Sequence, residues 1–120
     1  MAFETKSNEA TGEYISWIKG SGAMNEILSP PGPWELKEVR LHLSADGGTS
    51  ENFTITENAD EGPEFYVVHL ATDMETTSDV VQTYYNKEKH FGHKDNLQFT
   101  YANTNSKVWG LKVIYTFIRS

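Results

Sequence analysis

Residues 95–117 read DNLQFTYANTNSKVWGLKVIYTF, and two runs within this stretch alternate between apolar and polar positions. A period of two places successive side chains on opposite sides of a pleated strand, so each run predicts a β-strand. The apolar positions on the shared faces are Leu97, Phe99, Tyr101, Trp109, Leu111, Val113, Tyr115 and Phe117. The stretch therefore predicts two strands, and we expect the rest of the fold to form around them.

The two runs flank a short polar turn, and the second run is apolar on part of its other side. Residues 102–106 read ANTNS, and Asn and Ser readily adopt turn conformations. The opposite side of the second run carries Ile114 and Ile118. We therefore expect the two runs to form a pair, with the second one as a central strand covered on both sides.

Further runs with strand character occur upstream, separated by turn signals at intervals of about 8–12 residues. They lie at residues 13–19, 34–44, 52–56, 64–71 and 80–85, with a shorter run at 23–28. With no convincing helix, the pattern predicts an all-β fold, an antiparallel β-sandwich that is jelly-roll-like and has seven to eight strands. Counting strands leaves a jelly roll and an immunoglobulin-like sandwich both open.

Three local features refine this prediction. The apolar phase changes near Lys37 and Glu38, which predicts a β-bulge or a bend. The sequence ADGGT at residues 45–49 predicts a hairpin that joins the runs on either side of it. Residues 64–71 are apolar on both faces, which predicts a central or buried strand.

The length of 120 residues fits one domain. Residues 1–12 are polar and aperiodic, so we expect an N-terminal arm that is either frayed or ordered on a partner, followed by a single β-sandwich domain over residues 13–120.

Composition excludes several classes of function. The chain has no cysteine, no apolar N-terminal signal and no long apolar run, so we expect no membrane segment and synthesis in a reducing cytoplasm. Ten Lys and Arg against 17 Asp and Glu give a net charge of −7, which disfavours nucleic acid as a partner. A nucleophile elbow, a phosphate-binding glycine loop and a HExxH motif are all absent, so we expect a protein that is not an enzyme.

A metal site is conceivable but weakly supported. His90, His93 and Asp95 lie in one short loop, and imidazole and carboxylate are common zinc ligands. Without a helix to hold the imidazoles, the loop lacks fixed geometry. Oxygen ligands for calcium occur around residues 58–61 and 73–79, but their spacing does not match an EF-hand. We expect no metal and no cofactor.

Aromatic side chains are the remaining candidates for an interface or a ligand site. Adjacent aromatic residues in a strand point to opposite faces, so one ring of each pair faces away from the core. The candidates are Tyr84, Tyr85, Phe91, Tyr66 and Trp17.

Several segments together resemble small all-β proteins encoded among the structural genes of tailed bacteriophages. These segments are Leu41–Ala45, Glu51–Ile55, Val67–Leu70, Asp73–Met74, Ser78–Val80, Leu97–Asn105 and Trp109–Tyr115. The resemblance covers about residues 34–118 and consists of strands and turns, without an active-site motif. It implies a virion component such as a capsid decoration subunit, a head fibre or a small tail protein.

The leading hypothesis is a non-enzymatic virion structural protein that self-associates, as a homotrimer, and binds other virion proteins such as the major capsid protein. The alternative is a carbohydrate- or receptor-binding β-sandwich module that uses Tyr84, Tyr85 and Phe91 with the nearby His and Lys residues.

Overall fold

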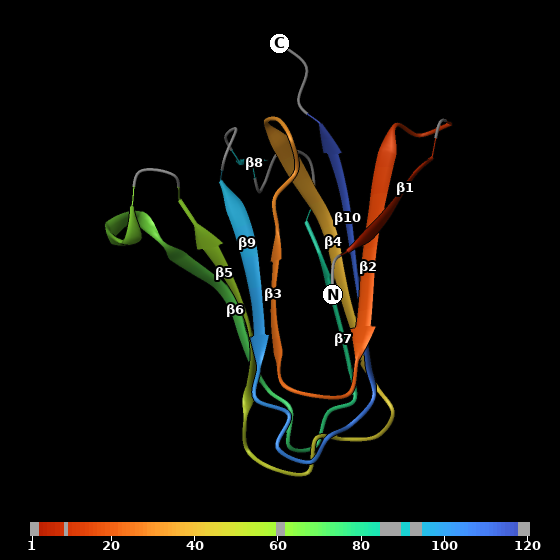
Figure 1. Cartoon of the computed structure of the whole chain (residues 1–120), viewed down its shortest axis with the longest axis vertical. Helices are drawn as coiled ribbons and strands as arrows, with labels where there is room; N and C mark the ends of the chain where they lie inside the picture. The colour runs from red at the N-terminus through yellow and green to blue at the C-terminus, as the bar shows by residue number, and fades with distance from the viewer. Residues whose placement is uncertain (1–2, 9, 60–61, 85–89, 92–94, 118–120) are drawn as a thin grey trace.

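The computed structural model describes residues 3–8, 10–59, 62–84, 90–91 and 95–117. They form two facing antiparallel sheets (Figure 1), so the prediction of an all-β antiparallel sandwich is confirmed. The strands are β1 Glu4–Asn8, β2 Glu13–Gly20, β3 Met24–Leu28, β4 Trp34–Leu43, β5 Asn52–Asn58, β6 Val67–Asp73, β7 Asp79–Thr83, β8 His90–Phe91, β9 Asn96–Tyr101 and β10 Trp109–Phe117. Among the described residues, no helix is both long enough and apolar enough to cross a membrane.

The strand order identifies a jelly roll. The larger sheet has the order β1-β2-β10-β4-β7, with β8 pairing β4, and the smaller sheet has the order β3-β9-β5-β6. Without β1 and the two-residue β8, eight strands remain, four in each sheet, and early strands interleave with late ones as in a double-sheet jelly roll.

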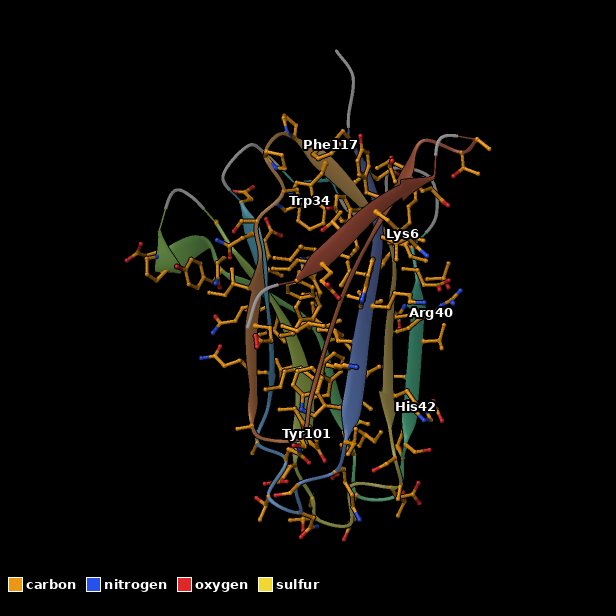
Figure 2. The ribbon with its side chains drawn as sticks, turned by 45° about the vertical axis from the view of Figure 1, so that its right-hand side comes forward. Lys6, Trp34, Arg40, His42, Tyr101 and Phe117 are labelled. Atoms are coloured by element: carbon orange, nitrogen blue, oxygen red, sulfur yellow. The ribbon has the colours of Figure 1, made fainter. Side chains whose placement is uncertain are left out.

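The core fills the space between the sheets with the inward faces of the alternating strands. Figure 2 shows Trp34 near one end of the sandwich and Tyr101 toward the other. At the first end, the ring of Tyr115 lies 5.6 Å from that of Trp34 and 5.9 Å from that of Phe117. The largest fully buried side chains are Trp34, Tyr101, Phe53, Phe99, Leu36, Leu41, Leu43, Ile55, Met74, Leu97, Leu111 and Val39.

The predicted bulge lies at Lys37. On β10, Ile114 pairs with Glu38 and Tyr115 pairs with Leu36, so Lys37 is the additional residue of β4. The bulge restores the inward direction of Leu36 after the phase change, and the Lys37 carbonyl accepts a hydrogen bond from the Tyr84 backbone N–H at 2.8 Å.

Two predicted pairings are wrong. β4 and β5 lie in different sheets, so residues 45–49 do not form a hairpin turn, and β9 and β10 are likewise separated between the sheets. β10 does take the predicted central position, between β2 and β4, but the prediction that it is covered on both sides is wrong, because its outer face is open and Lys112 is exposed. The alternating pattern specifies which face of a strand is buried, but it does not specify which strand supplies the hydrogen-bonding partner.

Several connections that cross between the sheets, namely β2–β3, β4–β5, β6–β7 and β9–β10, lie together at one end of the sandwich, which we call the closed end (bottom of Figure 1). Asn103, in the β9–β10 connection, ties this connection to the one between β2 and β3. Its amide donates to the carbonyls of Ser21, Gly22 and Lys107 at 3.2, 3.0 and 2.9 Å, and it adopts a positive φ of 51°, which Asn tolerates.

The prediction for residues 64–71 is also wrong. Pro63–Phe65 forms a 3-10 turn, and β6 is the edge strand of the smaller sheet, with Val68 59% exposed. Although β6 has apolar residues on both faces, it is an exposed edge strand and not a buried one.

Part of the polar N-terminal segment joins the larger sheet. β1 pairs with β2, the Thr5 and Ser16 hydroxyls are 2.8 Å apart, and the ring of Phe3 lies 6.2 Å from that of Phe99. An additional role for this segment on a partner stays a prediction.

Candidate functional site

The structure separates the aromatic residues that the sequence suggested. Tyr84 is a core residue, 6% exposed, so its ring does not offer a surface platform. Tyr66, which follows the 3-10 turn before β6, is 44% exposed, and Trp17 lies half-buried on the outer face of the larger sheet. Tyr85 lies outside the described residues, and Phe91 is described only as a backbone pair of Trp34.

The loop with the weak metal candidates is only partly described. His90 pairs with Glu35 through the β8 backbone, and the Asp95 carbonyl accepts a hydrogen bond from the Trp34 indole at 3.4 Å. His93 lies outside the described residues. Within the described ranges, no three His, Asp or Glu side chains are placed to hold a metal ion.

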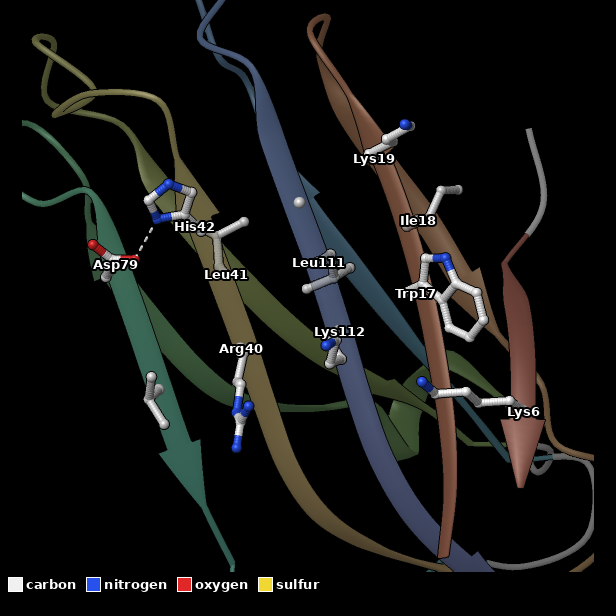
Figure 3. Close-up of a pocket in the computed structure, with 12 residues that line it drawn as sticks. Lys6, Trp17, Ile18, Lys19, Arg40, Leu41, His42, Asp79, Leu111 and Lys112 are labelled. Carbon is white, nitrogen blue, oxygen red and sulfur yellow. Dashed lines mark hydrogen bonds and ion pairs between the residues drawn. The ribbon is translucent and has the colours of Figure 1, made fainter. Parts of the chain in front are cut away.

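The outer face of the larger sheet carries a hollow of about 520 Å³. The register places its side chains in two cross-strand rows. One row consists of Lys19, Gly110, His42 and Asp79, and the other of Trp17, Lys112, Arg40 and Val81. Together with Lys6 from β1, these residues form the basic trough (Figure 3).

Local strand structure explains why these side chains face outward. In β10, Lys112 alternates with the buried Leu111 and Val113. In β4, the bulge at Lys37 sets the phase so that Arg40 and His42 face away from the core. Gly110 has no side chain, and a Cβ placed there would meet nothing within 4 Å, so the floor of the trough is open.

Charge in the trough is opposite to that of the chain as a whole. Lys6, Lys19, Arg40 and Lys112 line it, whereas Asp79 is its one carboxylate, in a chain of net charge −7. Arg40 forms an ion pair with the neighbouring Glu38. The three lysines form no ion pair with a described carboxylate.

Two contacts arrange the ends of the trough (Figure 3). At one end, His42 Nδ1 donates to Asp79 Oδ1 at 2.5 Å, and this hydrogen bond, together with one from Ser78, holds the pKa of Asp79 below its usual value. At the other end, the Lys6 ammonium lies 5.7 Å from the centre of the Trp17 ring, a cation–π distance. Lys112 and Arg40 are direct cross-strand neighbours of like charge, an arrangement that disfavours the fold, and the Glu38 carboxylate that pairs with Arg40 offsets part of this repulsion.

Sequence reasoning named Trp17 but missed the basic residues around it. Lys6, Lys19, Arg40 and Lys112 are spread over four strands, and no two are close in sequence. The available signal was that Lys19, Arg40 and Lys112 alternate with apolar positions and therefore share the outward phase, whereas the polar run around Lys6 carries no such signal. Only the strand order brings them together.

The outer face of the smaller sheet has a different composition. Its central outward positions carry no charged residue, and we call this surface the neutral face. It consists of Asn25, Ile27, Thr54, Thr56, Asn58, Val68, Ala71, Asn96, Gln98 and Thr100.

Side-chain amides connect three strands across the neutral face. Gln98 donates to Asn25 at 2.6 Å and accepts from Asn58 at 3.1 Å. The Oδ1 atoms of Asn58 and Asn96 are buried and accept no hydrogen bond from a described residue. At one end of the face, Asp73 adds a negative charge opposite its cross-strand partner Asn52.

Comparisons with known proteins are sparse. No protein-family model and no curated protein matches the chain. Among solved structures, a chain of the capsid of Ralstonia phage GP4 is similar, with 13% sequence identity, a TM-score of 0.44, and coverage of 88% of this chain and 86% of that one. The chain is thus similar, at low identity, to a phage capsid structure.

Proposed function

We propose that the chain is a non-enzymatic structural protein of a phage virion, a capsid decoration or head or tail accessory subunit, that self-associates and binds a larger shell. The observation that supports this most is the neutral face. Interface cores are depleted of charged residues, and this face has none at its ten central positions, although 22% of the chain is charged. Jelly rolls are also the architecture of many viral capsid domains.

The size of the neutral face indicates the kind of contact. Four strands about 4.8 Å apart and six residues of about 3.3 Å each cover roughly 400 Å², about half of what one partner buries in a standard stable interface. Ile27 and Val68, on the two edge strands of this face, are exposed and supply part of its apolar area. A contact of this size is weak singly and becomes strong when the linked copies of one oligomer bind a lattice together.

The proposal includes a homotrimer. A three-fold ring requires a heterologous contact, so the neutral face of one copy would meet a different surface of the next copy. Light scattering across a range of protein concentrations measures this directly. We expect a mass that rises with concentration toward three times 13.6 kDa.

Thr56→Lys places a charge at the centre of the neutral face and is expected to keep the chain at 13.6 kDa at every concentration. The matched control is Thr83→Lys, which makes the same change on β7 of the other sheet beside Glu38 and is expected to associate like the wild type. The proposed interface is wrong if both variants behave like the wild type. A chain that stays monomeric and fails to sediment with phage capsids contradicts the proposed function as a whole.

A further inference from the structure

We propose that the basic trough binds a carboxylated saccharide, a ligand class that goes beyond the structural role proposed above. The trough lies on the sheet opposite the neutral face, so both surfaces are accessible in one copy of the chain. Its volume of about 520 Å³ lies within the range of small-molecule sites, which is about 300–1,000 Å³.

Three chemical features of the trough fit an acidic sugar. Lys19 and Lys112 flank the open floor at Gly110 and have no described carboxylate partner, so they are available to a ligand carboxylate. Trp17 supplies a flat apolar surface on which the C–H face of a sugar ring can pack. The exposed pair of His42 and Asp79 offers donors and acceptors to hydroxyl groups.

The same geometry disfavours two other anionic ligands. The floor strand β10 is paired on both sides, with β2 and β4, so its backbone groups cannot add a peptide strand. A nucleic acid would be repelled at long range by the net charge of −7, and its affinity depends mainly on many phosphate contacts. A short ligand with one or a few carboxylates and many hydroxyls therefore matches the trough best.

The test is titration calorimetry of the full chain with trigalacturonic acid, together with ¹H–¹⁵N spectra that report the Trp17 indole and the Gly110 amide. We expect binding that shifts both signals, and no binding of the neutral analogue galactotriose. Lys112→Gln is expected to weaken the affinity about tenfold, the effect of one charge-assisted hydrogen bond.

Two further variants separate the trough from total charge and from folding. Gly110→Val fills the open floor from a Cβ that would meet no other atom within 4 Å, so it is expected to fold normally and lose binding. Lys107→Gln removes one positive charge at the closed end, outside the trough, and is expected to bind like the wild type. Thr56→Lys alters only the neutral face and is also expected to bind normally, so a failure of assembly would not affect this test.

Four results would overturn the proposal. They are no binding at about 10 mM ligand, equal binding of galactotriose, an equal loss of affinity in Lys107→Gln, and tighter binding of hexaglutamate or of a thymidine hexanucleotide.

Discussion

Gly47 lies where two connections meet at the closed end. Its N–H donates to the Met74 carbonyl at 2.9 Å, and the Tyr101 hydroxyl lies against the same Cα. A Cβ at this position would come within 2.5 Å of the Tyr101 oxygen and 2.6 Å of the Met74 oxygen. Because one of the two is a backbone atom, the clash cannot be relieved by rotating a side chain.

We therefore expect Gly47→Ala to lower the free energy of unfolding by about 1–3 kcal/mol, the usual cost of overpacking. Urea denaturation monitored by fluorescence of the three tryptophans measures this. The matched control is Gly22→Ala in another loop of the closed end, where a Cβ meets nothing within 4 Å and φ is not positive. It is expected to stabilise the fold by about 0.4–1 kcal/mol, and equal effects of the two substitutions would contradict the packing argument.

Trp17 and Tyr84 show what a residue-level pattern can predict. Both are aromatic residues in predicted strands, and the sequence suggested both as surface candidates. Trp17 lies on the outward phase of β2, whereas Tyr84 follows β7 and turns into the core, with its backbone N–H bonded to the bulge at Lys37. The phase within one strand predicts opposite faces, but only the packing of a second sheet defines which face is inside.

At the scale of an element, β4 carries the clearest feature predicted from sequence. Its inward residues fall on two phases, and the bulge at Lys37 joins them. Because the register period is two, one inserted or deleted residue moves every following side chain to the other face unless a bulge absorbs it.

Deletion of Lys37 is expected to leave a regular strand in which Leu36 and Val39 still point inward. It removes the hydrogen bond from the Tyr84 backbone N–H and is expected to lower the free energy of unfolding by about 1–3 kcal/mol. Deletion of Arg40, in the same strand, moves Leu36 and Val39 outward and is expected to abolish folding. Far-ultraviolet circular dichroism with thermal unfolding compares the two. If both deletions unfold the chain alike, Lys37 is not the residue that absorbs the phase change.

Pairing between elements was predictable only in part. The central position of β10 followed from its length and its apolar residues on both sides. The partners of β5 and β9 did not follow, because the connections at the closed end cross between sheets where a turn motif suggested a hairpin. Short loops rich in Gly, Asn and Asp serve both purposes, so loop composition does not distinguish them.

At the scale of the whole molecule, the two outer faces have opposite chemistry. The larger sheet exposes lysines, an arginine and a tryptophan around an open floor, and the smaller sheet exposes amides, hydroxyls and small apolar groups. The two faces are separated by the core, so substitutions on one are expected to leave the function of the other unchanged.

The dependence of stability on pH is a property of the whole fold. Hydrogen bonds lower the pKa of Asp73, chiefly from Ser50, and of Asp79, chiefly from His42, below the ordinary value of 3.8. Their contribution to stability is therefore complete above that value and is lost as pH falls through the lowered pKa values. Burial raises the pKa of Tyr101 above 10.0, so its contribution is complete below that value and is lost as pH rises through the raised pKa.

Urea unfolding across the pH range measures how the free energy of unfolding falls on the acid side (the acid limb) and on the alkaline side (the alkaline limb). Asp79→Asn is expected to flatten the acid limb, and Tyr101→Phe the alkaline limb. At neutral pH Tyr101→Phe is expected to change stability by less than about 1 kcal/mol, because the phenol makes no hydrogen bond with a described residue. An alkaline limb that is the same in Tyr101→Phe and wild type would show that other groups determine it.

The sequence by itself determined the fold class, the approximate strands, the bulge in β4 and the central place of β10. These features depend on local alternation and on turn-forming residues, which are written in consecutive positions. The tertiary structure alone decided the jelly-roll order, the edge position of β6, the burial of Tyr84, and the assembly of the basic trough and the neutral face. Each of these depends on which distant strands become neighbours, as when β10 pairs with β2 near the opposite end of the chain. Such non-local pairing depends on how the whole core packs, so no local stretch of sequence encodes it.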